Sequence, residues 1–211
     1  MDLIREGFIV NMNFLAIDTS VDICSISLCI DSQVVDSIDD LVKSSHTKLL
    51  ATNVNELFKR NNLELNKLDY IVLSIGPGSY SGLKVGSSFA KGLAFSIQKE
   101  IIPINTIAYM NAKLNINGNY YIAIFSHRDY VFYQEFSDGH PIGEQYCNRV
   151  SNLKSIDLYG YDLKKISNIN YTEVKPSSVN LANYLINNYD SLGSFEKDIS
   201  TVSPIYLKKS D

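Results

Sequence analysis

The chain has 211 residues, of which 45% are hydrophobic, and a formal net charge of −4. This length fits one sizeable domain or two small ones, and the apolar fraction excludes intrinsic disorder. A mildly acidic chain is a poor candidate for holding nucleic acid by itself, because phosphate contacts need clustered Lys and Arg. No apolar run approaches the ~18 residues of a membrane span, and residues 1–11 lack the apolar core of a signal peptide. We therefore expect a cytoplasmic protein.

Residues 12–114 predict a succession of strands and helices. Short apolar runs predict buried strands, and apolar residues at helical spacing predict helices. In chain order the prediction is strands at 14–19, 23–30 and 33–38, a helix at 44–61, a strand at 70–75, a helix at 83–98, a strand at 100–104 and a short helix at 106–114. Such a mixture is typical of an α/β fold.

Three cysteines are present, Cys24, Cys29 and Cys147. Their odd number and the absence of CxxC or His/Cys spacing argue against a disulfide framework and against a zinc site. Because Cys24 and Cys29 lie in an apolar strand-like run, we expect them to be buried, inert thiols.

The predicted helix at 44–61 carries one stripe of residues at helical spacing. The stripe comprises His46, Leu49, Leu50, Asn53, Val54, Leu57 and Phe58. His46 has no His or carboxylate at the spacing of a metal site. Contact with the core or with a partner is therefore the favoured interpretation of His46.

A glycine-rich loop, G-P-G-S-Y-S-G-L-K-V-G, follows the strand at 70–75 and opens the next helix. Backbone amides at a helix N-terminus attract anions. The loop fits neither nucleotide template, because Lys84 comes one position too late for a P-loop and the glycine spacing is one residue too long for a Rossmann turn. A tight strand-to-helix turn and direct ligand binding both stay open. The motif comprises Gly76, Pro77, Gly78, Ser79, Tyr80, Ser81, Gly82 and Lys84.

Residues 115–119 are the best candidate for a boundary between two lobes. Beyond them the pattern predicts strands at 120–125, 130–136 and 156–159 and a helix near 178–188. His127 and His140 have no nucleophile or metal partner at a recognisable spacing, and the carboxylates of this half suggest no acid/base pair.

Three motifs together resemble one family. These are F-L-A-I-D-T-S at 14–20, S-S-H-T-K-L-L at 44–50 and the glycine loop followed by A-K-G-L-A at 90–94. They are similar to the TsaB (YeaZ) family, a subunit of the bacterial machinery that makes threonylcarbamoyladenosine in tRNA. The loop differs from the family pattern G-P-G-S-F-T-G-L-R-I-G only by conservative replacements. The match covers roughly residues 12–114 and thins to fragments beyond.

The resemblance implies an actin-like/Hsp70-like ATPase (ASKHA) fold with two small α/β lobes and mixed sheets. Residues 1–11 would be an appendage, 12–114 the first lobe and 115–211 a smaller second lobe. In that fold the hairpin after the first strand faces nucleotide phosphate, so Asp18, Thr19 and Ser20 are expected there, although these residues are also ordinary turn formers.

The resemblance also implies partners: the catalytic paralogue TsaD, the ATPase TsaE and a second copy of the chain, with tRNA reached only through the complex and no membrane. In the family the first helix packs against its counterpart in TsaD or in a second copy. The expected partner interface is therefore His46, Leu49, Leu50, Asn53, Val54 and Leu57.

A comparison with the paralogue favours a subunit without catalytic residues. The paralogue carries two metal-binding His residues four apart, where this chain has Thr106 and Met110. Thr and Met are weak ligands for a hard catalytic metal. We therefore expect no metal and no tightly bound cofactor in the isolated chain, with ATP or ADP at the interface of the complex. The alternative is a small nucleotide-dependent kinase or ATPase that uses Asp18, Thr19 and the loop.

Overall fold

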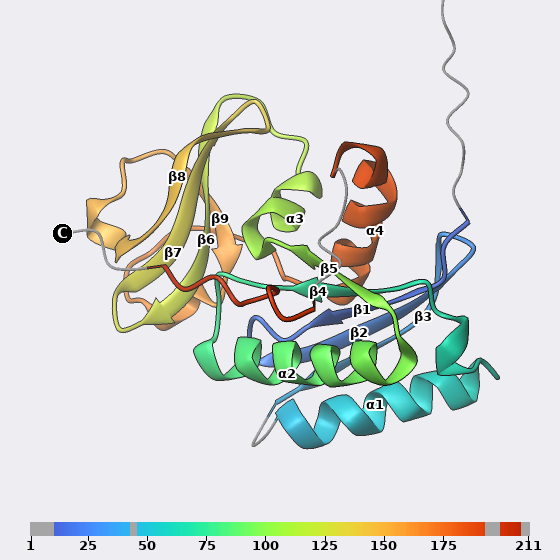
Figure 1. The fold of residues 1–211 in the computed structure, drawn as a ribbon. Coiled ribbons are helices and arrows are strands. Elements are labelled where there is room, and N and C mark those ends of the chain that lie inside the picture. The colour runs from blue at the N-terminus through green and yellow to red at the C-terminus, as the bar shows by residue number, and fades with distance from the viewer. Residues whose placement is uncertain (1–10, 43–45, 193–198, 208–211) are drawn as a thin grey trace, which may run out of the picture.

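The computed structural model describes residues 11–42, 46–192 and 199–207, which form two five-stranded sheets with helices packed against them (Figure 1). The first sheet contains β1 (Phe14–Asp18), β2 (Ile23–Ile30), β3 (Gln33–Leu41), β4 (Tyr70–Ser74) and β5 (Glu100–Ile104), in the order β3-β2-β1-β4-β5. The second contains β6 (Asn119–His127), β7 (Tyr130–Ser137), β8 (His140–Arg149), β9 (Asp157–Tyr161) and β10 (Thr172–Glu173), in the order β10-β9-β6-β7-β8. The α-helices are α1 (His46–Arg60), α2 (Tyr80–Ile97), α3 (Thr106–Ala112) and α4 (Ser178–Asn188), and 3₁₀ turns lie at Leu65–Lys67, Val150–Asn152, Leu163–Lys165 and Tyr189–Ser191.

Both sheets are mixed. In the first sheet β1 pairs antiparallel with β2 and parallel with β4, and in the second β6 pairs antiparallel with β7 and parallel with β9. The hairpin between β2 and β3 turns on Asp31 and Ser32, whose positive φ angles of 50° and 59° suit a tight two-residue turn. The predicted α/β fold with two mixed-sheet lobes is thus confirmed.

Helices cover both faces of the first sheet (Figure 1). On one face Leu15 and Ile17 of β1 belong to the same buried cluster as residues of α1 and α2. On the other face Phe14 and Ala16 belong to a cluster with residues of α3 and α4. Every residue of β1 is buried, which explains the apolar run from Phe14 to Ile17.

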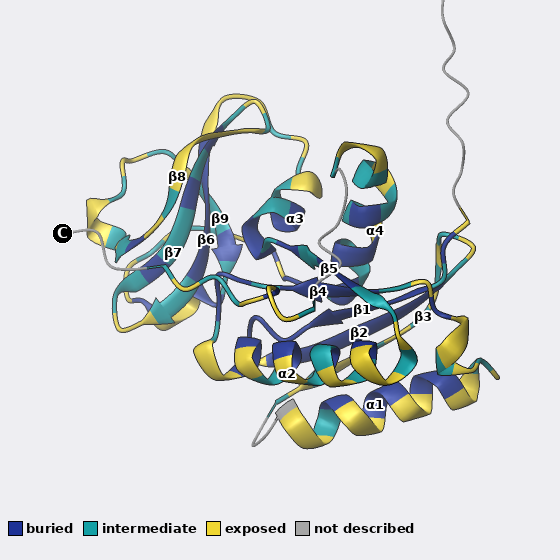
Figure 2. Ribbon diagram, viewed as in Figure 1, coloured by how far each residue is buried: buried dark blue, intermediate teal, exposed yellow. Residues whose placement is uncertain are grey.

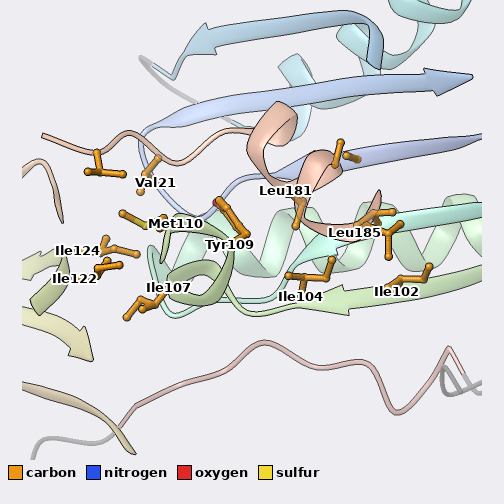
Figure 3. Close-up of a cluster of buried hydrophobic side chains, with 14 of the residues drawn as sticks. Val21, Ile102, Ile104, Ile107, Tyr109, Met110, Ile122, Ile124, Leu181 and Leu185 are labelled. Carbon is orange, nitrogen blue, oxygen red and sulfur yellow. The ribbon is translucent and has the colours of Figure 1, made fainter. Parts of the chain in front are cut away.

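The face covered by α3 and α4 continues toward the second sheet. Figure 3 shows Ile102 and Ile104 of β5 beside Leu181 and Leu185 of α4. The same buried cluster includes Ile122 of β6. One core therefore joins the two sheets, and it fixes how the lobes meet.

The predicted partner stripe of α1 lies against this chain's own first sheet. Leu50 and Leu57 are fully buried, Asn53 and Val54 nearly so, and Leu49 is half-buried. The Asn53 amide donates a hydrogen bond of 2.8 Å to Asp40 of β3, and Figure 2 shows the buried positions of α1 turned toward the sheet. The structure therefore assigns these side chains to the core of this chain rather than to the surface of a partner. His46 is the first residue of α1, and its side chain lies outside the described part of the structure.

The first lobe is completed by residues from the far end of the chain. α4 packs against the first sheet, Val202 is buried in the cluster beneath α1 and α2, and the Ile205 N–H donates to the Ile75 carbonyl at 2.7 Å. The predicted second lobe, 115–211, is therefore too long, since its separate sheet spans only residues 119–173. Of the predicted appendage, residues 1–10 lie outside the described part.

All three cysteines are buried, and Cys24 and Cys29 are free thiols. Burial raises the pKa of the Cys24 and Cys29 thiols to about 12, so both stay protonated at neutral pH. In the part of the chain that the structure covers, we find no helix with the length and hydropathy of a membrane span.

Candidate functional site

A cleft of about 700 Å³ lies between the two lobes. One wall comes from the first lobe, from residues 20–22 and 78–81 with Val42 and Val85. The opposite wall comes from the second lobe, from residues 124–127 with Phe132, Tyr161, Asp162 and Lys165. The lining residues lie at or just after the ends of central strands of both sheets, and α/β folds commonly bind ligands at such strand ends.

The glycine loop forms part of the first wall and packs directly on the end of β1. The Ser79 N–H donates to the Ser20 carbonyl at 2.7 Å, and a Cβ added at Gly78 would lie 2.2 Å from that same oxygen. Further along, within α2, a Cβ at Gly86 would lie 2.2 Å from the Thr19 hydroxyl. These glycines permit close backbone contact, which gives the tight-turn interpretation a direct structural reason.

The loop nevertheless presents polar groups to the cleft. Ser79 caps α2 by accepting a hydrogen bond of 3.3 Å from the Gly82 N–H, and Ser79, Tyr80 and Ser81 all line the cleft. The Lys84 ammonium lies 4.7 Å over the Tyr80 ring, on the edge of this wall.

Asp18 lies in the interior next to the cleft. Tyr109 of α3 donates a short hydrogen bond to one carboxylate oxygen, and the Ser20 N–H donates to the other at 2.8 Å. Burial raises the pKa of the Asp18 carboxyl, and these two hydrogen bonds counteract part of that rise. The pKa of the Tyr109 phenol is raised well above its usual range by burial and by the nearby carboxylate, so Tyr109 remains a donor.

Of the three residues expected to face a nucleotide, Ser20 alone lines the cleft. Thr19 is fully buried and its hydroxyl donates to the Gly82 carbonyl at 2.8 Å. The structure therefore places Asp18 and Thr19 inside the protein, where they hold β1, α2 and α3 together.

The donors near Asp18 do not fit a divalent metal ion. The Thr106 hydroxyl is hydrogen-bonded to Ser74 at 2.9 Å, and Met110 is buried in the core. The Asp18 carboxylate already accepts a hydrogen bond from Tyr109. Among the described residues we find no group of three or more His, Cys, Asp or Glu that could hold a metal. No step of a reaction can be assigned to a metal at this position.

The second wall was not predicted as a site. Tyr161 donates to Asp22 across the cleft at 3.0 Å, and Asp162 forms an ion pair with Lys165. The Lys165 ammonium also lies 5.2 Å over the Phe125 ring. Ser126 and His127 lie beside them in the lining, and no local sequence pattern marks Tyr161 or Lys165.

Sequence comparisons find relatives over about half of the chain. The model of the family "TsaD: tRNA N6-adenosine threonylcarbamoyltransferase" matches residues 34–135. The tRNA threonylcarbamoyladenosine biosynthesis protein TsaB of Haemophilus influenzae is 35% identical over 100 residues, which cover 47% of this chain and 42% of that protein. The TsaB protein of Escherichia coli is 29% identical over 99 residues, 47% of this chain and 42% of that protein. The matched stretch thus spans less than half of these relatives.

Solved structures match over nearly the whole chain. YeaZ from Pseudomonas aeruginosa superposes with a TM-score of 0.74 at 20% identity, covering 93% of this chain and all of that one. A second crystal structure, described as a protein with similarity to peptidase YeaZ from the same organism, gives a TM-score of 0.77 at 18% identity over the same shares. The fold is therefore the ASKHA fold of YeaZ.

Proposed function

This chain is a homologue of the TsaB (YeaZ) proteins, and we propose that it acts in tRNA threonylcarbamoyladenosine biosynthesis as a subunit without catalytic residues of its own. The observation that supports this best is the environment of Thr106 and Met110, which stand where the paralogue TsaD would carry metal-binding histidines. Thr106 is hydrogen-bonded to Ser74 and Met110 is 1% exposed. Neither side chain lines the cleft.

The proposed partner is TsaD, and the proposed contact is the outer face of α1 and α2. These helices lie side by side on the solvent side of the first sheet (Figure 1). The exposed positions of α2 are Tyr80, Ser81, Lys84, Ser88, Gly92, Phe95 and Ser96, and from Ser81 onward they form one stripe. Phe95 is 81% exposed. Small residues beside one exposed aromatic ring allow another helix to approach closely, and aromatic anchors dominate many interfaces.

Further features of the complex belong to this proposal. The same face would join two copies of the chain when TsaD is absent. TsaE would bind only to the assembled pair, tRNA would be reached through TsaD, and ATP or ADP would be held at the subunit interface.

Co-purification with TsaD tests the interface. We expect Phe95→Arg to weaken binding at least 30-fold, the loss that corresponds to a hot spot of about 2 kcal/mol. The matched control is Tyr146→Arg on β8, where the ring is 41% exposed on the other lobe. Equal binding by both variants would remove α2 from the interface.

Reconstitution tests the function itself. Synthesis of threonylcarbamoyladenosine by TsaD and its other partners should require this chain, and Phe95→Arg should lower the yield as it lowers binding. Hydrolysis of ATP by the isolated chain, or full synthesis without it, would contradict the proposal.

A further inference from the structure

The cleft between the lobes is lined by aromatic side chains from both walls. Phe125 of β6, Phe132 of β7 and Tyr161 of β9 come from the second lobe, and Tyr80 of α2 comes from the first. Apolar and aromatic linings of a few hundred cubic ångströms are typical of small-molecule sites, and this cleft measures about 700 Å³. Aromatic walls favour a ligand that carries a flat ring, since stacking stabilises such a ring whatever its substituents.

Hydroxyl groups lie among these rings. Ser79, Ser81 and Ser126 line the cleft, and each hydroxyl can both donate and accept a hydrogen bond. Asp22 and Asp162 add carboxylate acceptors. A ligand with hydroxyl or amino donors around its ring would satisfy this set.

The charge of the cleft disfavours phosphate. Its described lining has two carboxylates, Asp22 and Asp162, against the single ammonium of Lys165, a formal charge of −1 with His127 counted as neutral. That ammonium is already paired with Asp162 and covers the Phe125 ring. The first turn of α2 contributes a partial positive charge of only about half an elementary charge. Lys84 lies over Tyr80 and is not part of the lining.

From these observations we propose that the cleft binds an uncharged aromatic molecule of nucleoside size that carries hydrogen-bond donors, and that it rejects phosphorylated forms of the same molecule. This inference goes beyond the proposed partner role and does not rest on it. It assigns a ligand to the wall of the second lobe, which the partner role leaves unused.

Calorimetry with adenosine, AMP, ATP–Mg²⁺ and ribose as probes tests the proposal on the full chain. We expect saturable binding of adenosine, with AMP and ATP at least tenfold weaker and ribose without measurable binding. The proposal is overturned if adenosine shows no saturable binding up to about 10 mM, or if ATP binds as tightly as adenosine.

Phe132→Ala tests the aromatic wall. Loss of one stacking surface should weaken adenosine about 5- to 150-fold, the range that corresponds to base–aromatic stacking. Tyr146→Ala, which removes an exposed ring outside the cleft, is the matched control and should bind adenosine like the unaltered chain. Thermal unfolding of both variants verifies that they are folded. If folded Phe132→Ala binds adenosine normally, the ligand does not occupy this cleft.

Asp162→Asn tests the charge argument separately. The residue has a positive φ of 62°, a conformation that Asn adopts readily, so the backbone should tolerate the change. The substitution leaves Lys165 without its carboxylate and brings the described lining to a formal charge of zero. We expect the preference for adenosine over AMP to shrink at least fivefold. An unchanged preference would show that the carboxylates do not exclude phosphate.

Discussion

The buried contact between Tyr109 and Asp18 should contribute measurably to stability. Tyr109→Phe removes the hydroxyl that donates to the Asp18 carboxylate and leaves the ring in place. Both residues are 1% exposed, so water cannot replace the lost donor. Removing one partner of a buried hydrogen bond costs about 1–3 kcal/mol, and we expect the free energy of unfolding to fall by that amount at neutral pH.

The loss should depend on pH in a definite direction. Burial raises the pKa of Asp18 above its ordinary value of 3.8, and the hydrogen bond from Tyr109 counteracts part of that rise. A carboxyl whose pKa is raised in the folded state binds more protons than in the unfolded state, so stability falls as pH rises from about 3.8 to the folded pKa. Without the Tyr109 donor, the pKa of Asp18 in the folded state rises further, so the stability continues to fall up to a higher pH. The deficit of Tyr109→Phe should therefore be smaller in acid and larger at neutral pH.

Urea unfolding followed by far-ultraviolet circular dichroism measures this, since the chain has no tryptophan. The control is the same change in an Asp18→Asn background, where residue 18 cannot titrate. There the cost should be about 0.5–1.5 kcal/mol, as for a neutral hydrogen bond, and independent of pH. A Tyr109→Phe deficit below about 0.5 kcal/mol at pH 7, or one that is constant between pH 4 and pH 7, would refute the reasoning.

Three further predictions concern the core and the glycine loop. Gly78→Ala should destabilise the fold by about 1–3 kcal/mol, because the new methyl group would lie 2.2 Å from the Ser20 carbonyl oxygen. Gly92→Ala places its methyl group where no atom lies within 4 Å, and it should stabilise α2 by up to about 1 kcal/mol. Similar urea midpoints for the two variants would contradict this prediction. Leu50→Ala should lower the free energy of unfolding by about 2–5 kcal/mol, whereas Leu41→Ala, at a 61% exposed position, should change it by no more than about 0.5 kcal/mol. If Leu50→Ala lowers the free energy of unfolding only slightly, Leu50 becomes a candidate for a partner interface again. Cys24 and Cys29 of β2 should resist thiol reagents at pH 8 until urea unfolds the chain, because both are buried. Mass spectrometry locates the labelled residues, and rapid labelling of the native protein at either one would show that burial does not protect it.

Local patterns in the sequence were sufficient for most of the first lobe. The apolar run of β1 depends on short-range features and appears where it was expected. The glycine motif also leads into a helix as expected, but α2 begins at Tyr80, three residues before the predicted start, so the end of the motif is helical. The stripe on α1 shows the limit of such patterns. Helical periodicity identifies which face of a helix is apolar, but not whether the same chain or a partner covers it. Here the chain's own sheet covers Leu50 and Val54.

The second lobe was harder to predict because its features depend on distant contacts. β8 was not predicted, since it begins with His140 and Pro141, contains Gly143 and is mostly exposed at the edge of its sheet. Such a strand has no buried alternation for the sequence to reveal. The cleft was missed for a related reason: Tyr161 and Asp22 meet only after both sheets have formed.

The return of α4 to the first sheet determines the order in which this protein can mature on the ribosome. Synthesis supplies all five strands of that sheet before the second sheet begins, yet α4 lies beyond β10 in the chain. Until α4 has emerged, much of the apolar face that it covers lacks its native cover, and closing so long a loop is slow. A nascent chain stalled within the second lobe should therefore engage a chaperone at this face, and release should follow once α4 can dock.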